Sequence, residues 1–95
     1  MSLEMHDWQI LSLHVQWVEG TLQINLRSSQ GATKLVAKGL RHLRLPRRED
    51  WGPANTIQAH DGPLQVGGGR NFRLLIQIHS GDMVEIEAES FDLPF

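Results

Sequence analysis

Alternation of apolar and polar residues dominates the first third of this 95-residue chain. The phase of this alternation changes only near Glu19-Gly20 and Gln30-Gly31. Between these points the apolar side chains occupy every second position: Leu11, Leu13, Val15, Trp17, Leu22, Ile24, Leu26, Leu35 and Ala37. A period of two is typical of β-strands with one buried face and one face in water. Both phase changes contain a glycine, which favours the tight turn of a hairpin. We therefore predict an N-terminal three-stranded antiparallel meander.

Hairpin geometry predicts which residues face each other across these strands. A two-residue turn at each glycine pairs Trp17 with Leu22 and Leu26 with Leu35. Opposed residues of antiparallel strands share one face of the sheet, so this register places the apolar set on a single face. The alternating residues of 11–37 are therefore assigned to core packing rather than to function.

A second hairpin is predicted at the C-terminal end. Even-numbered apolar residues alternate on both sides of a glycine: Phe72, Leu74, Ile76, Ile78, Val84, Ile86 and Ala88. A three-residue loop at Ser80-Gly81-Asp82 pairs Ile78 with Val84. Earlier in the chain, the apolar phase slips at Gly39-Leu40, which indicates a β-bulge.

The whole pattern predicts an all-β fold. A short strand near 56–60 and the lack of any helical stripe bring the expectation to about six antiparallel strands. We predict a single domain over 1–95, either a compact antiparallel sandwich or a partly open barrel. No signal-like leader, long apolar stretch or cysteine is present in the sequence, so we expect a cytoplasmic protein without membrane contact.

Charges of opposite sign gather in two segments, although the net charge is only −2. Four of the nine basic residues lie within 41–48, and five of the eleven acidic residues lie in the last fourteen positions. We expect these segments to pair within the chain or to form a self-complementary dimer contact. The C-terminal hairpin also places Arg73 opposite Glu89. Trp51, in a polar loop, either covers an open end of the core or anchors an interface. The candidate interaction surface consists of Arg41, Arg44, Arg47, Arg48, Trp51, Glu85, Glu87 and Glu89.

Motifs for catalysis or metal binding are not evident in the sequence. The five histidines show no i, i+2 or i, i+4 spacing, so we assign no catalytic, cofactor-binding or metal residue and expect no cofactor. One alternative is a small metal- or ligand-dependent enzyme in which His6, His60 and the C-terminal glutamates converge. Another is nucleic-acid binding through the basic 41–48 strip, which the negative net charge and the missing aromatic stacking pair disfavour.

Several short motifs resemble those of a known class of proteins. They are a His-Asp-Trp start at 6–8, a Glu-Gly hairpin within 17–21, Leu-Arg-Leu-Pro-Arg at 43–47, Trp-Gly-Pro at 51–53 and Ile-Glu-Ala-Glu-Ser-Phe at 86–91. The chain thereby resembles small uncharacterised bacterial β-proteins, some of them similar to immunity-type proteins of polymorphic toxin systems. The resemblance implies a cytoplasmic, non-enzymatic domain that binds another protein. The absence of a convergent catalytic set leads us to the same expectation, with a protein partner or a second copy as the ligand.

Overall fold

Six antiparallel strands form one sheet in this protein, for which we describe residues 4–45, 56–66 and 71–94 of a computed structural model. The strands are β1 (Gln9–Gln16), β2 (Thr21–Ser28), β3 (Gly31–Arg44), β4 (Ile57–Gln65), β5 (Phe72–Ile78) and β6 (Met83–Asp92). Their order across the sheet is β1-β2-β3-β6-β5-β4. The predicted all-β class, the N-terminal meander and the C-terminal hairpin are confirmed. In the described ranges, no helix is long and apolar enough to span a membrane.

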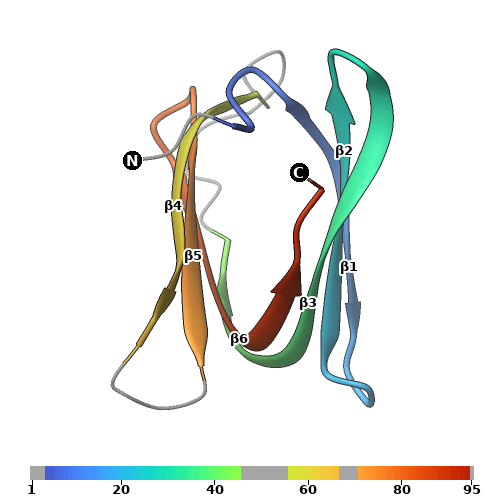
Figure 1. The fold of residues 1–95 in the computed structure, drawn as a ribbon, viewed down its shortest axis with the longest axis vertical. Coiled ribbons are helices and arrows are strands. Elements are labelled where there is room, and N and C mark those ends of the chain that lie inside the picture. The colour runs from blue at the N-terminus through green and yellow to red at the C-terminus, as the bar shows by residue number, and fades with distance from the viewer. Residues whose placement is uncertain (1–3, 46–55, 67–70, 95) are drawn as a thin grey trace.

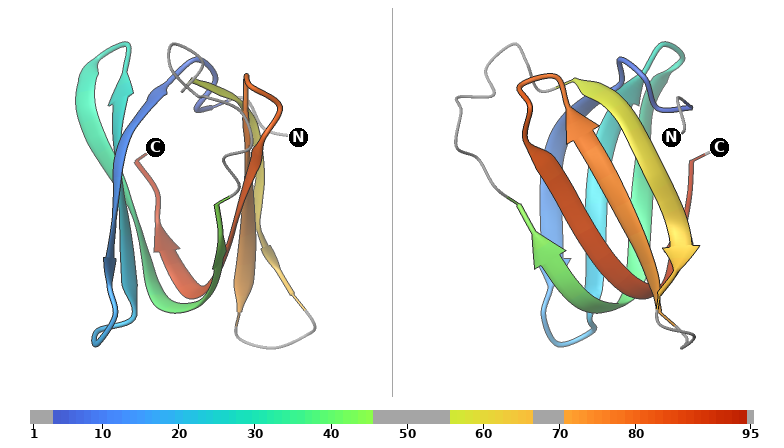
Figure 2. Two further views of the ribbon diagram at one scale, coloured as in Figure 1. Left: turned by 180° about the vertical axis from the view of Figure 1, so that it is seen from behind. Right: turned by 90° about the vertical axis from the view of Figure 1, so that its left-hand side faces the viewer.

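The sheet bends into two facing walls joined along one end. β1 and β2 lie in one wall and β4 and β5 in the other, while β3 and β6 curve from one wall to the other (Figure 1). The same arrangement is visible from behind and from the side in Figure 2. At the opposite end an isolated bridge joins Gln9, the first residue of β1, to Thr56, which precedes β4. The sheet is therefore partly open and is not closed into a barrel.

A bulge and a glycine lie where β3 bends. The register between β3 and β6 shifts between Leu40 and His42, next to the predicted bulge at Gly39-Leu40. Gly39 has a φ of 66°, which glycine adopts without the steric cost that a Cβ would add. Its neighbour Leu40 donates a backbone hydrogen bond of 2.7 Å to the carbonyl of Gly20 in the first hairpin turn. This hydrogen bond therefore joins the bend of β3 to the turn between β1 and β2.

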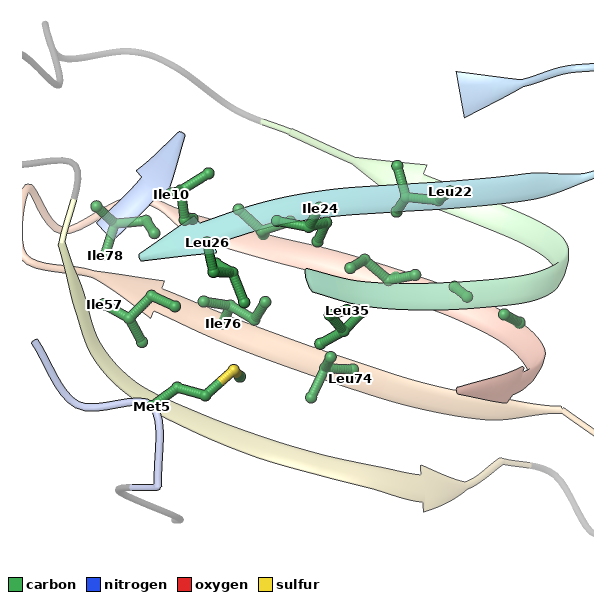
Figure 3. Packing of buried hydrophobic residues seen from close by; sticks show 14 residues of the cluster. Met5, Ile10, Leu22, Ile24, Leu26, Leu35, Ile57, Leu74, Ile76 and Ile78 are labelled. Carbon is green, nitrogen blue, oxygen red and sulfur yellow. The ribbon is translucent and has the colours of Figure 1, made fainter. Parts of the chain in front are cut away.

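The hydrophobic core fills the space between the two walls (Figure 3). Alternate residues of β2, β5 and β6 supply most of its fully buried side chains, as the period-two pattern predicts. Met5, which precedes the first strand, is also fully buried and packs near Ile57 in this cluster. Each fully buried Leu, Ile or Met contributes about 1.5–3 kcal/mol, so the core supplies the main stabilising term.

The strand registers differ from the predicted ones by two residues in each hairpin. Val15, and not Trp17, is opposite Leu22. Leu26 is opposite Thr33 rather than Leu35, because the second turn falls one residue earlier, at positions 29–30.

In the C-terminal hairpin of β5 and β6, Val84 faces Ile76 and not Ile78, because the loop is longer than the three residues predicted. A shift of two keeps every side chain on its face of the sheet, so the alternate residues of β2, β5 and β6 that were predicted to face inward do so.

The assignment of the whole alternating run to the core is wrong at β1. Trp17 lies in the turn instead of the strand and is 88% exposed. Leu11 lies at a register shift between Ile10 and Ser12 and is 47% exposed, while Ile10 takes the buried position. Val15 points to the core side but is 45% exposed, since β1 is the edge strand.

Candidate functional site

The two edge strands of the sheet, β1 and β4, differ in how their free edges are protected. β4 carries Asp61, Gly62 and Pro63, and its register with β5 shifts between Asp61 and Leu64. A charge, a proline and a bulge each hinder the addition of another strand. β1 reads Gln-Ile-Leu-Ser-Leu-His-Val-Gln and contains no proline and no Asp, Glu, Lys or Arg. Apart from the bridge at Gln9, its outer edge pairs with no strand in the described part of the chain.

Apolar side chains gather along β1 and on the turn that follows it. We call Leu11, Val15, Trp17 and Val18 the β1 edge surface. Val18 is 98% exposed, next to Trp17 at the tip of the hairpin, and the two strand residues are about half exposed. Exposed apolar patches next to unpaired backbone groups mark sites of protein interaction. The β1 edge surface is therefore the first candidate functional site.

A row of ion pairs crosses the outer face of β3, β6 and β5. Arg41 Nη2 lies 2.6 Å from Glu89 Oε1, and His42 Nε2 lies 3.0 Å from Glu85 Oε2. Arg73 Nη1 approaches the other oxygen of Glu85 at 3.8 Å. Residues of the basic 41–48 strip thus pair with acidic residues of β6 within the chain. Pairing within the chain is one of the two arrangements predicted from the sequence, the other being a dimer contact. These side chains are partly exposed to solvent, so each pair adds at most about 1 kcal/mol.

The strand register places two further residues of the predicted interaction surface, Arg44 and Glu87. Arg44 lies opposite Glu85 in the strand register, and Glu87 lies between His42 and Arg73 on the neighbouring strands. The predicted pairing of Arg73 with Glu89 is wrong because the register differs by two residues. The other three members lie outside the described residues: Arg47, Arg48 and Trp51.

A polar network covers the outer face of the first hairpin. Gln23 Nε2 donates to Asn25 Oδ1, and Asn25 Nδ2 donates to Ser12 Oγ, both at 2.8 Å. Ser12 and Asn25 are opposed across β1 and β2. The network joins β1 to β2 by side chains as well as by the backbone ladder, which holds the edge strand in place.

Three groups that can bind a metal meet at the end of the sheet where the walls are bridged. His6 Nδ1 lies 3.3 Å from Asp7 Oδ2, and His79 Nε2 lies 3.1 Å from Asp7 Oδ1. The two imidazole rings meet edge to face, with centroids 5.8 Å apart. The cluster joins the N-terminal turn to the β5–β6 loop, which are more than seventy positions apart in the sequence. Sequence spacing gave no sign of it, because two of its members meet only in the fold.

The alternative interpretation of the sequence, a metal- or ligand-dependent enzyme, brought His6 together with His60 and the C-terminal glutamates. The structure brings His79 to His6 instead. His60 is buried on β4, and its Nε2 lies 3.0 Å from Glu4 Oε2. Within the described ranges, the His6, Asp7 and His79 cluster is the one group of three potential ligands close enough to share an ion. No glutamate belongs to that group.

Comparisons with protein-family models, with curated proteins and with solved structures find no match to this chain.

Proposed function

We propose that this chain is a protein-interaction domain that binds a second copy of itself through the β1 edge surface. The proposal depends on one observation: an uncharged, proline-free edge strand carries half-exposed apolar residues, while the opposite edge strand is interrupted and charged. Edge strands of this kind readily accept another strand, and natural β-proteins usually block them.

A second copy is the partner that best matches this edge. Two β1 strands related by a two-fold axis pair antiparallel. Along residues 11–16 no other described strand pairs with the outer edge of β1, so each copy can supply backbone groups to the other there. Because β1 has no formally charged side chain, this pairing brings no like charges together. Trp17 and Val18 at the hairpin tip add apolar area beyond the strands. Tryptophan is among the residues most enriched at the centres of interfaces.

The resemblance to immunity-type proteins supports protein binding but favours a foreign partner. For that partner the paired charges around Arg41 and Glu89 offer a polar surface separate from β1. Nucleic-acid binding through 41–48 receives less support, because Arg41 and His42 each face a carboxylate. The experiment below therefore distinguishes self-association from binding by the charged surface.

Sedimentation velocity of the untagged chain tests the proposal over a range of concentrations. We expect a monomer–dimer equilibrium that Val15→Lys and Trp17→Lys each shift to monomer. Leu64→Lys is the matched control, since Leu64 is a 59% exposed leucine on the other edge strand. It should leave the dimer intact.

Trp17→Lys tests the surface without disturbing the fold, because the Trp17 side chain lies in a turn and makes little contact with the core. A monomer at every concentration for the unmodified chain would overturn the proposal. So would a dimer that survives both lysine substitutions but dissociates on Arg41→Glu.

A further inference from the structure

We propose that His6, Asp7 and His79 bind one transition-metal dication of the Zn²⁺ type, with further coordination positions left to water. This site contains no residue of β1, so metal binding here does not depend on self-association through β1.

The distances within the cluster match what such an ion requires. A tetrahedral Zn²⁺ with ligands at about 2.0–2.2 Å holds neighbouring donor atoms roughly 3.3–3.6 Å apart. The Asp7 carboxylate oxygens lie 3.3 Å and 3.1 Å from the nitrogens of His6 and His79. All three donor atoms lie within 4.8 Å of one another, so an ion can enter between them with small side-chain rotations.

Backbone hydrogen bonds hold both halves of the cluster against the same short segment. The N–H of Asp7 donates to the carbonyl of Ile57 at 2.7 Å, and the N–H of His79 donates to the carbonyl of Thr56 at 3.0 Å. Asp7 itself has a φ of 66°, a left-handed conformation that aspartate tolerates better than most residues. The ligands are therefore positioned by the folded sheet, which reduces the entropy lost on binding.

The N-terminal turn is fixed on its other side as well. Met5 precedes His6 and is fully buried in the core, and the N–H of Trp8 donates to the Met5 carbonyl at 3.1 Å. The N–H of Ile57 then donates to the carbonyl of Trp8 at 2.8 Å. This frame leaves the side chains of His6 and Asp7 on the solvent side while their backbone is anchored.

The donor set selects the class of metal. Two imidazole nitrogens and one carboxylate oxygen suit Zn²⁺, Cu²⁺, Ni²⁺ and Co²⁺, whereas Ca²⁺ and Mg²⁺ prefer six or more oxygens. The single carboxylate offsets one of the two charges of the ion. All three side chains are at least one-third exposed, so the ion reaches the site from solution and retains bound water.

Calorimetric titration of the untagged, chelator-treated chain with ZnCl₂ tests this site, and the d–d absorption of Co²⁺ reports the ligand set. We expect one equivalent per chain and a fall in affinity of at least about tenfold in His6→Ala and in His79→Ala. His14→Ala and His42→Ala are matched controls, because both remove exposed histidines away from the cluster. They should bind Zn²⁺ as the unmodified chain does.

Asp7→Asn separates ligation from folding, since asparagine also tolerates the left-handed conformation and keeps the side-chain shape. We expect its melting temperature without metal to stay close to that of the unmodified chain, while Zn²⁺ no longer raises it. The proposal is overturned if the unmodified chain binds no Zn²⁺, or if affinity and stoichiometry persist in the His6→Ala/His79→Ala double variant. It is also overturned if the two control substitutions weaken binding equally.

Discussion

Gly39 and Glu89 lie in direct contact at the bend of the sheet, and the Glu89 side chain occupies the space that a Cβ at position 39 would need. Such a Cβ would lie 2.6–2.8 Å from three atoms of Glu89, closer than side-chain carbons approach in folded proteins. The φ of 66° at Gly39 adds a second reason for glycine there. Two independent constraints thus meet at the residue where β3 turns toward the opposite wall.

Gly39→Ala should therefore lower the free energy of unfolding more than a left-handed backbone alone explains. We expect a loss of about 1–2 kcal/mol from the backbone and about 1–3 kcal/mol from the overlap with Glu89, measured by urea denaturation. Gly20→Ala is the matched control, because Gly20 has the same φ of 66° and an ordinary 3.7 Å contact. Equal losses in the two variants would show that the contact with Glu89 is unimportant.

Truncation of a buried side chain in β5 should be costly, whereas truncation of an exposed side chain in the neighbouring β4 should be nearly neutral. Ile76 is fully buried, so Ile76→Ala should lower the free energy of unfolding by about 2–5 kcal/mol. Leu64→Ala, on the exposed side of β4, should change it by no more than about 0.5 kcal/mol. Similar effects at the two positions in thermal and chemical denaturation would contradict the burial described for β5.

The position of Trp17 in a turn predicts a small effect of its removal. Trp17→Ala should cost less than about 0.5 kcal/mol when measured on the monomer, against about 3–5 kcal/mol for a buried tryptophan. The register with Trp17 opposite Leu22 would require the larger loss. Chemical denaturation at low protein concentration, with sedimentation to verify the monomer, decides between the two registers.

The ion pair between Arg41 and Glu89 should contribute a small, salt-sensitive coupling. A double-mutant cycle with alanine at both positions should give about 0.2–1 kcal/mol at low ionic strength and less in 1 M NaCl. Arg27 with Glu89 is the control cycle, because Arg27 lies on β2, which is not adjacent to β6. A coupling that is unchanged by salt would indicate a desolvated pair rather than the exposed one seen at 2.6 Å.

The faces of the strands were predictable from the sequence, but their registers were not. Alternation determines which side chains share a face, and a shift of two residues leaves that choice intact. The length and the position of the loop set the register, and Glu19-Gly20 and Gln30-Gly31 are compatible with several lengths and positions. Leu22 and Leu26 therefore faced inward as predicted, while their partners across the hairpins were each misplaced.

The candidate sites depend on which strands lie at the edges and which loops meet, and both are properties of the topology. Val15 and Trp17 have the pattern of core residues. Val15 is half exposed because β1 ends the sheet, and Trp17 is exposed because it lies in the turn that follows β1. The absence of charge from β1 was the one sequence signal that could have identified it as an unprotected edge. His79 lies close to Asp7 because the two walls of the sheet are bridged at this end. The spacing of residues along the sequence does not predict that contact.

The sharing of β3 and β6 by both walls also determines how the chain acquires its structure. Val36 pairs with Asp92, 56 positions later, and Arg44 pairs with Glu85, 41 positions later. Contacts of such long range slow folding, because a large loop must close before they form. During synthesis the β1–β2–β3 meander therefore emerges with its apolar face uncovered and its β3 edge unpaired until β6 has left the ribosome. An apolar face and an unpaired strand edge are the two features that make a folding intermediate prone to aggregation, and the finished fold encloses both.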